Sequence, residues 1–388
     1  MLKRVEIEGF KSFKNNVVID FEKTKYTGLE DTNTFKNGIL KGAVFFGSNA
    51  SGKSTVLEAI SFLFETLVGN ALTRYDHLFC AFSKEESFKL KYDFVFGTDH
   101  IRYEIERIKS GKKKHQFFVE NLKINDQIFM ERFEASAKRI SEGKSTFYSD
   151  LDPNVLFLRT EYFNKGFNEK CIKDLFDFAQ SSVYLNMFRT RIAAASNNLE
   201  LRRYLEEFGP ARLNKFLEEN NFVHRIEYIK VDTKGKESTS LSNLSNTIIA
   251  IRRTDIDNVM LEYSDESDGT INLFNILPSF LQCLNKGSLL LIDEFCSGFH
   301  NELEELLIRY FFKKSKKSQI FVVTHSTNVL SNTLFRPDQM FKIDFVKGSG
   351  SQMFRISNSQ PRPGQNIEKM YLGNAFGTSK GFIDKDEA

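Results

Sequence analysis

The apolar positions of the first 70 residues change from strand-like to helix-like spacing around one glycine-rich loop. Apolar residues within residues 2–21 fit two short strands either side of a polar turn, and the run from Ala43 to Phe46 is short enough for a buried strand. That run ends directly on Gly47. After Thr55 the apolar residues recur at helical spacing, at Val56, Leu57, Ile60, Leu63, Phe64 and Leu67. The pattern predicts a strand, a glycine loop and a helix.

The middle of the chain changes period twice. Between about Phe88 and Met130 apolar and polar residues alternate with turns between the runs, which predicts an antiparallel β meander. Residues 131–222 then favour helices, because charged amphipathic stretches recur there without a heptad pattern. A strand over 224–231 and an exposed, mobile polar loop over 233–246 should follow.

The last third alternates between strand and helix patterns. We expect strands over 259–263, 289–292 and 320–323, with helices over 270–284, from about Asn301, and after His325. Such alternation is typical of a parallel sheet with crossover helices. The predicted fold class is therefore α/β, with a mixed or parallel core sheet, an antiparallel β meander and an inserted helical lobe. The predicted parts are an N-terminal half, the helical lobe, a C-terminal half and a tail, over 1–130, 131–222, 223–360 and 361–388.

Composition excludes several classes of protein. Hydrophobic residues make up 41% and charged residues 27% of the 388 residues, which is typical of a globular chain rather than a disordered or fibrous one. The sequence contains no stretch of about 18 apolar residues, and its N-terminus lacks the apolar run of a signal peptide. The cysteines are far apart and form no CxxC pattern, at Cys80, Cys171, Cys283 and Cys296. We expect a cytoplasmic protein with reduced thiols and no membrane contact.

Two local clusters of basic residues stand out, although the net charge of +3 is too small to attract nucleic acid by its overall field. The first, KSGKKKH over 109–115, fits a solvated hairpin turn. The second comprises Lys313, Lys314, Lys316 and Lys317, where cations complement the C-terminal end of a helix. A contact with DNA or RNA phosphates is the alternative interpretation of both clusters.

The glycine loop carries the clearest chemical signal. Its sequence, GSNASGKST, matches the pattern G-x-x-x-x-G-K-[ST], and a predicted strand and helix flank it as that motif requires. Its backbone N–H groups and the helix start would hold phosphate oxygens. Lys53 would reach the β- and γ-phosphates, and Ser54 would offer a hydroxyl to Mg²⁺. The candidate nucleotide-binding residues are Gly47, Ser48, Asn49, Ala50, Ser51, Gly52, Lys53, Ser54 and Thr55.

A second motif places two acids at the end of an apolar strand. The sequence LLLIDE over 289–294 would put Asp293 beside the metal and leave Glu294 free to accept a proton from an attacking water. Apolar runs that end in acids are common, and the phosphate loop upstream is what favours the catalytic interpretation. Asp293 and Ser54 are thus the predicted Mg²⁺ ligands, and Glu294 the predicted general base.

Two further segments flank that strand. ESDGT over 266–270 stands at a predicted helix start, where Ser267, the backbone of Gly269 and the helix N-terminus could bind an anion. In THS, over 324–326, His325 follows a strand. Each has an ordinary alternative, because Ser267 could simply cap the helix and His325 could be a core or surface histidine.

The order of these motifs resembles the ABC-type ATPases, in particular the branch with SMC, RecF and OLD proteins. The resemblance rests on VEIEGFKSF over 5–13, the phosphate loop, ESDGT, LLLIDE and THS, from residue 1 to about 330. Within that branch, LKGAVFFGSNASGKSTVLEAI and the late MYLGNAFG look most like the RloA/AbiL type of bacterial ATPase, which is often paired with an effector in anti-phage defence. The resemblance implies an ABC-type P-loop ATPase that uses ATP and Mg²⁺.

The resemblance also implies how the motifs cooperate. Two protomers would enclose two ATP molecules, with Ser267 and Gly269 contacting the γ-phosphate of the other protomer's ATP and His325 sensing the γ-phosphate within its own. Lys53, Glu294 and His325 would be the catalytic residues. Transporter relatives carry LSGGQ, whereas Asp268 and Thr270 depart from that signature here. OLD proteins also carry a Toprim nuclease, and we find no nuclease signature in this sequence.

Three functions remain open at this point. The first is an ATPase whose dimerisation around ATP controls a separately encoded effector, such as a nuclease or toxin, in anti-phage defence. The second is a RecF-like ATPase that binds DNA directly in repair or maintenance. The third is a nucleotide-dependent scaffold in which ATP turnover is incidental.

Overall fold

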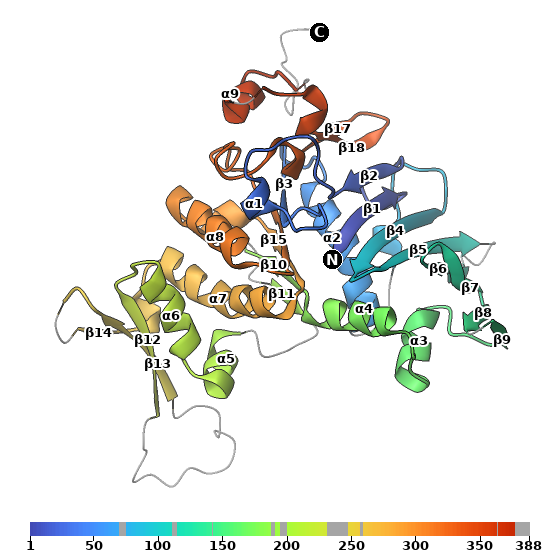
Figure 1. Cartoon of the computed structure of the whole chain (residues 1–388), viewed down its shortest axis with the longest axis horizontal. Helices are drawn as coiled ribbons and strands as arrows, with labels where there is room; N and C mark the ends of the chain where they lie inside the picture. The colour runs from blue at the N-terminus through green and yellow to red at the C-terminus, as the bar shows by residue number, and fades with distance from the viewer. Residues whose placement is uncertain are drawn as a thin grey trace. The chain divides into compact units, whose positions relative to one another are not determined.

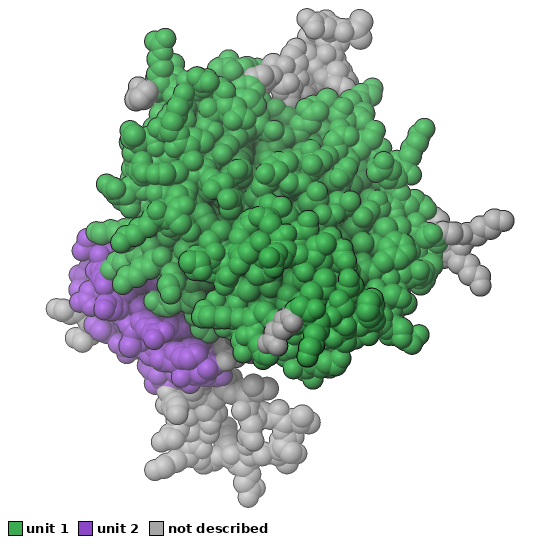
Figure 2. Space-filling view, turned by 45° about the vertical axis from the view of Figure 1, so that its right-hand side comes forward, with its two compact units in different colours: residues 1–195, 283–297, 301–388 green, residues 196–282, 298–300 purple. Residues whose placement is uncertain are grey.

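The computed structural model divides the chain into two compact units (Figure 2). The first comprises residues 1–195, 283–297 and 301–388, and the second comprises 196–282 and 298–300. None of the described helices is long and apolar enough to cross a membrane. The structure describes residues 1–69, 75–110, 115–141, 143–187, 191–194, 200–230, 247–256, 259–362 and 364–376.

The first unit is built around a seven-stranded sheet in the order β11-β10-β15-β16-β3-β17-β18 (Figure 1). Its five inner strands run parallel, and the two outermost strands pair antiparallel. Three inner strands are buried along their whole length, which explains their continuous apolar sequences. The strands are β3 (Gly42–Phe46), β10 (Val183–Asn186), β11 (Arg191–Ala194), β15 (Leu289–Asp293), β16 (Gln319–Val323), β17 (Met340–Val346) and β18 (Gly350–Arg355).

The second sheet of this unit is the predicted meander, and it is longer than predicted. It has eight antiparallel strands in the order β2-β1-β4-β5-β6-β7-β8-β9, and it ends at Tyr148 rather than near Met130. The helical expectation is therefore wrong for 131–148, where short hairpins extend the sheet edge. The strands are β1 (Leu2–Glu8), β2 (Val17–Asp20), β4 (Ser87–Phe96), β5 (Asp99–Ser110), β6 (His115–Ile124), β7 (Gln127–Phe133), β8 (Ser136–Ser141) and β9 (Lys144–Tyr148).

Helices α2 (Lys53–Leu67) and α4 (Lys170–Ser181) pack between the two sheets. On the meander side, the Tyr92 hydroxyl donates to the Ala59 carbonyl of α2 at 2.6 Å, and Phe94 meets Phe178 of α4 edge to face. α8 (Asn301–Lys314) belongs to the opposite face of the core sheet, where Lys41 donates to the Phe312 carbonyl. The result is a layered α/β unit with a phenylalanine-rich core.

The second unit is smaller and mixes helices with a three-stranded antiparallel sheet. Its core is apolar and includes Leu213, Phe216, Ile226, Ile251 and Phe274. The helices are α5 (Leu201–Phe208), α6 (Ala211–Glu219) and the greater part of α7 (Asp268–Lys286), and the strands are β12 (His224–Lys230), β13 (Thr247–Arg253) and β14 (Met260–Glu262). The predicted helix over 270–284 is thus confirmed, whereas the predicted loop at 233–246 lies outside the described residues. The four predicted sequence ranges stay a prediction.

The remaining elements are short, and one expected helix does not form. Residues after His325 run through turns, rich in Ser, Thr and Asn, until Pro337 opens a 3₁₀ turn before β17. Such side chains compete with helix formation by bonding nearby backbone groups. The short elements are α1 (Glu30–Asn33), α3 (Phe157–Asn164), α9 (Ile367–Leu372), and the 3₁₀ turns Asp76–Leu78, Tyr263–Asp265, Phe295–Gly298, Pro337–Gln339 and Ile356–Ser359.

Candidate functional site

The glycine loop between β3 and α2 adopts a backbone that only glycine accommodates at two positions. Gly47 has φ +149°, and a Cβ there would lie 2.0 Å from the Ile343 carbonyl oxygen. Gly52 has φ +103°, and its Cβ would lie 2.3 Å from the Ser351 hydroxyl. Both distances are too short for any side chain, so only glycine lets the loop pack this closely against Ile343 and Ser351. In this conformation the backbone N–H groups of the loop remain available beside the N-terminus of α2.

Two segments far away in sequence hold this loop in place. Ser351, at the start of β18, donates its hydroxyl to the Ser51 carbonyl at 2.6 Å and its N–H to the Ser12 carbonyl at 2.7 Å. Ser12 belongs to the opening VEIEGFKSF and lies 3.5 Å from the Thr55 hydroxyl. Ser351 was missed by sequence reasoning, since no motif marks it. The loop is therefore supported from both the N-terminal turn and the β17–β18 hairpin.

Lys53 is buried at the first position of α2. Its ammonium donates to the carbonyls of Gly47 at 3.0 Å and Ser48 at 2.7 Å. Burial lowers the pKa of this ammonium, and the nearby carboxylates of Glu294 and Asp293 partly restore it. The lysine therefore points back along the loop, where a phosphate chain would replace part of its lost hydration.

Asp293 ends β15 and faces the same helix start. Its carboxylate accepts hydrogen bonds from the hydroxyls of Ser54 and Tyr184 and from the Asn186 amide, each at 3.0 Å. Burial raises the pKa of Asp293, the Ser54 and Tyr184 hydroxyls lower it, and Glu294 and Glu58 raise it. The carboxylate is thus surrounded by neutral donors and further acids instead of a basic partner.

The donor set around Asp293 fits Mg²⁺. The Ser54 hydroxyl and the Asp293 carboxylate are adjacent hard oxygen ligands, and the hydrogen bonds to the buried acid come from neutral donors. Within the described residues, no cluster of three or more His, Cys, Asp or Glu side chains could hold a metal by itself. Mg²⁺ in nucleotide sites is commonly held by one or two protein ligands together with phosphates, so the sparse set is suitable.

Glu294, one residue further on, has a strained backbone. Its φ is +57°, in the left-handed region that a side chain adopts only at a cost in free energy. Both carboxylate oxygens lie 3.2 Å from Nε2 of His325, which follows β16 by two residues. The backbone turn therefore directs Glu294 away from Asp293 and toward the histidine.

These side chains surround one cavity of about 470 Å³. A void of that size suits a small ligand. Every residue of its wall belongs to the first unit, and the wall brings the phosphate loop together with the predicted base and histidine. It is lined by Ser12, Asn49, Ala50, Ser51, Gly52, Lys53, Ser54, Thr55, Glu294 and His325.

Sequence reasoning missed β10 and its two polar residues. Tyr184 and Asn186 lie on this strand, which pairs in parallel with β15 so that Asn186 stands opposite Asp293. The segment had been assigned to the helical lobe. The only signal was the short apolar run Val183–Leu185 after a helix, which periodicity cannot distinguish from the end of that helix.

The signature-like segment lies in the second unit. Ser267 is exposed and accepts a hydrogen bond from the Thr270 N–H at 3.3 Å, while the two hydroxyls lie 2.9 Å apart. Ser267 therefore caps α7, as the simpler interpretation expected. Gly269 lies in the first turn of the same helix. Contact of either residue with a phosphate stays a prediction.

The basic clusters have ordinary roles where the structure describes them. Lys109 pairs with Asp76 at 3.0 Å and lies over the Phe79 ring, while residues 111–114 of its cluster lie outside the described residues. In the second cluster, Lys313 and Lys314 end α8, and the Lys314 ammonium lies over the Tyr310 ring. A contact with nucleic acid stays a prediction for both.

Part of the late MYLGNAFG motif lies beside the nucleotide end of the core sheet. The Tyr371 ring of α9 packs edge to face on Phe46, the residue before the phosphate loop. Glu368 accepts a hydrogen bond at 2.7 Å from Thr327, two residues after His325. The helix therefore contacts both segments that carry the cavity's polar residues.

Comparison with solved structures supports the fold. The SMC head domain from Thermotoga maritima matches with a TM-score of 0.50 and 16% identity, over 91% of this chain and 98% of that chain. A structure described as the SmcHead bound to the C-winged helix domain of ScpA matches with a TM-score of 0.49 and 14% identity, over 92% and 99%. The first likeness confirms the predicted P-loop α/β fold, with a mixed core sheet and an antiparallel meander.

Comparison with curated proteins yields no match. A family model described as "AAA domain, putative AbiEii toxin, Type IV TA system" matches residues 43–331, which include the phosphate loop, the Asp293–Glu294 pair and His325. That span is well over half of the chain. The protein thus belongs to this family of AAA-domain P-loop ATPases.

Proposed function

We propose that this protein is an ATP-hydrolysing, ABC-type ATPase that dimerises around ATP and regulates a separately encoded effector in bacterial anti-phage defence. The observation that carries the proposal is the single cavity in which the phosphate loop, Glu294 and His325 meet. The family description, which refers to a type IV toxin–antitoxin system, supports the association with defence. We also propose, from the resemblance of the phosphate-loop segment and of MYLGNAFG, that the chain is of the RloA/AbiL type.

The cavity's residues suit the binding of a triphosphate. The loop's backbone N–H groups and the N-terminal end of α2 supply partial positive charge for phosphate oxygens. Lys53, which now donates to two loop carbonyls, would turn its ammonium to the β- and γ-phosphates. Ser54 and Asp293 would hold Mg²⁺, which in such sites neutralises charge on the β- and γ-phosphate oxygens.

Glu294 is the group that would activate the attacking water. Its carboxylate lines the cavity and is directed away from Asp293 by the backbone turn at +57°. It would accept a proton as the water oxygen bonds to the γ-phosphorus and the bond to ADP breaks. His325, within 3.2 Å of both carboxylate oxygens, would fix the base in orientation and offer an N–H to the γ-phosphate.

The closed state would need a second protomer. The cavity wall comes from the first unit alone, and Ser267 stands exposed at the start of α7, where a helix N-terminus could meet a phosphate from outside. We propose that Ser267 and Gly269 complete the site of the partner protomer, so that opening and closing of the dimer is the output. The effector, a nuclease or toxin, would respond to that change.

The substitution Glu294→Gln tests the assignment. We expect the variant to bind ATP, to hydrolyse it roughly 10²–10³-fold more slowly, and to accumulate closed dimers, because only the proton acceptor is lost. Steady-state hydrolysis, nucleotide binding and light-scattering mass would be measured together. Glu302→Gln is the control, since it removes an exposed carboxylate from the first turn of α8. Normal turnover in Glu294→Gln would refute the base.

The same variants separate the alternative functions. In a phage challenge, defence by the chain with its neighbouring genes should fail in Lys53→Ala and in Glu294→Gln. Full defence with Glu294→Gln would favour a scaffold in which turnover is incidental. Stimulation of hydrolysis by DNA alone, in the purified protein, would favour the RecF-like function.

A further inference from the structure

A second cavity, of about 550 Å³, lies in the first unit at the opposite end of the core sheet from the phosphate loop. Its wall comes from residues 25–28, 332, 336–337, 360–362 and 364. β17 and β3 are parallel neighbours, with Met340 opposite Val44. The wall residues at 336–337 precede β17, whereas the phosphate loop follows β3, so the two cavities are separated by the length of the strands.

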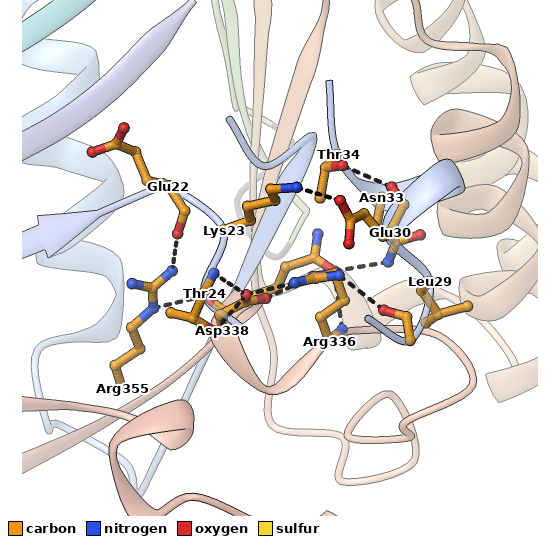
Figure 3. A network of polar contacts seen from close by, with 12 residues as sticks. Glu22, Lys23, Thr24, Leu29, Glu30, Asn33, Thr34, Arg336, Asp338 and Arg355 are labelled. Atoms are coloured by element: carbon orange, nitrogen blue, oxygen red, sulfur yellow. Dashed lines mark hydrogen bonds and ion pairs between the residues drawn. The ribbon is translucent and has the colours of Figure 1, made fainter. Parts of the chain in front are cut away.

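Buried polar contacts fix the base of this cavity (Figure 3). Arg336 makes two hydrogen bonds to the Asp338 carboxylate, at 2.9 and 2.8 Å, and both side chains are fully buried. The same guanidinium donates to the Gly28 carbonyl at 3.0 Å. Thr24 donates its N–H and hydroxyl to Asp338, at 2.7 and 2.9 Å. The 25–28 loop is thus anchored at both ends, and the cavity is built into the fold.

Two wall residues carry buried polar atoms that the protein leaves unsatisfied. Within the described residues, neither the Tyr26 hydroxyl nor the Asn332 side-chain oxygen has a hydrogen-bond partner. The Asn332 amide nitrogen is already used, because it donates to the Gln365 carbonyl, so the free oxygen is an acceptor. Buried polar groups without a partner are uncommon in proteins and often mark a place where another molecule binds.

The charge of the wall favours an anion. Lys25 and Arg362 are exposed, and in the described part of the chain neither side chain forms an ion pair or hydrogen bond. Asp338 cannot neutralise them, since its oxygens are occupied by Arg336 and Thr24. The apolar side chains of the wall are the Tyr26 ring, Pro337 and Pro361. Such a surface suits a planar ring.

We propose that this cavity binds a nucleotide, in addition to the ATP held by the phosphate loop. The phosphate would face Lys25 and Arg362, the base would lie against Tyr26 and the prolines, and a base N–H would donate to Asn332. The volume suits a ligand of this size. The segment that carries Asn332 begins directly after His325, so the nucleotide would occupy a regulatory site. The inference does not depend on ATP hydrolysis.

Calorimetric titration would test the site in the full chain with its phosphate loop loaded with Mg²⁺ and one equivalent per chain of a non-hydrolysable ATP analogue, so that no excess analogue fills the second cavity. The probes are GMP, UMP and inorganic phosphate. We expect one further site per chain for at least one of the monophosphates, and at least tenfold weaker binding of inorganic phosphate. Arg362→Ala and Asn332→Leu should each weaken the monophosphate at least tenfold, and Tyr26→Phe severalfold. Lys347→Ala, an exposed lysine in the β17–β18 turn, should change nothing.

The opposite results would overturn the inference. These are the absence of a further site for both monophosphates, affinities unchanged in Arg362→Ala and Tyr26→Phe, or inorganic phosphate binding as tightly as the nucleotides. Tyr26→Phe removes one hydroxyl and Arg362 is exposed, so both variants should fold. Lys53→Ala separates the two sites, since it should lose the ATP analogue from the phosphate loop and keep the monophosphate in the second cavity.

Discussion

Two buried aspartates at opposite ends of the core sheet have opposite electrostatic surroundings. Burial raises the pKa of Asp293, and the hydroxyls around it do not compensate. Asp338 is equally buried, yet its pKa is lowered, because the bidentate contact with Arg336 and the hydrogen bonds from Thr24 outweigh the effect of burial. The same residue type is thus held by a bidentate arginine at one end of the sheet, and by neutral hydrogen-bond donors at the other.

The difference separates a structural group from a functional one. Asp338 has every partner within the chain, and its contacts join the N-terminal loop to β17. Asp293 lies beside a strained Glu294 and a buried Lys53 whose pKa is lowered by its own burial. Unsatisfied charge and strained backbone commonly mark sites where a ligand supplies the missing interactions.

The largest expected effect is on stability, in Asp338→Ala. The variant leaves the buried Arg336 guanidinium without its carboxylate, which should lower the free energy of unfolding by about 3–5 kcal/mol. Chemical denaturation would measure the loss. Hydrolysis by the folded fraction at low temperature should change little, because Asp338 is remote from the phosphate loop.

Asp293→Ala is the matched comparison. It should cost less stability than Asp338→Ala, because the relief of burying a charge offsets part of the three lost hydrogen bonds, but it should reduce hydrolysis by about 10²–10³-fold. If Asp293→Ala unfolded the protein while Asp338→Ala did not, the division into a structural and a functional aspartate would be wrong.

A second buried acid at the nucleotide end gives a pH-dependent prediction. Glu304, in the first turns of α8, is fully buried, and neither carboxylate oxygen accepts a hydrogen bond within the described residues. Burial raises the pKa of Glu304 to about 7. The Ser326 hydroxyl lowers this pKa in part, although it lies outside hydrogen-bonding geometry, and the nearby Glu305 carboxylate raises it further. Glu304 is therefore neutral in the folded protein below pH 7.

Glu304→Gln should become more stable relative to the unchanged protein as the pH rises. The raised pKa means that the contribution of Glu304 is fully present below its ordinary value of 4.5 and is lost as the pH rises to about 7. The difference in unfolding free energy between the two proteins should shift by roughly 3 kcal/mol between pH 4.5 and pH 8. Denaturation at both pH values would measure the shift, and exposed Glu302→Gln should show none. A constant difference would contradict the raised pKa.

Much of the fold could be predicted because its signals are local. The phosphate loop followed from a strand, two glycines and a helix within 42–67, and the structure places all three as expected. The Asp293–Glu294 pair and His325 each lie at or just after the carboxyl end of a buried, mostly apolar strand, and the carboxyl ends of parallel strands meet at one edge of a sheet. Local sequence patterns were therefore sufficient to predict that these residues lie at the same edge of the core sheet.

The rest depends on contacts between distant segments. Ser351 supports the loop from 300 residues away, and β10 is a strand because it pairs with β15. The expected helix after His325 failed because turn-forming side chains and Pro337 favour an irregular path, whose apolar residues are nonetheless buried. The wall of the second cavity comes from three irregular segments that are far apart in the sequence, and no periodic pattern of apolar residues predicts that they meet. Tertiary contacts decide these features, so a single sequence cannot show them.

The smallest predicted effect concerns the strand that the sequence did not reveal. Tyr184→Phe removes one of the hydrogen bonds to Asp293, worth about 1 kcal/mol, so hydrolysis should fall roughly 3–10-fold. Tyr75→Phe is the matched control, since its hydroxyl donates at 2.9 Å to the Asn154 carbonyl, away from the cavity. The two variants should lose similar stability, and only Tyr184→Phe should lose activity. Equal activity in both would mean that Ser54 and Asn186 suffice to hold Asp293, and that the Tyr184 hydroxyl contributes to stability rather than to positioning.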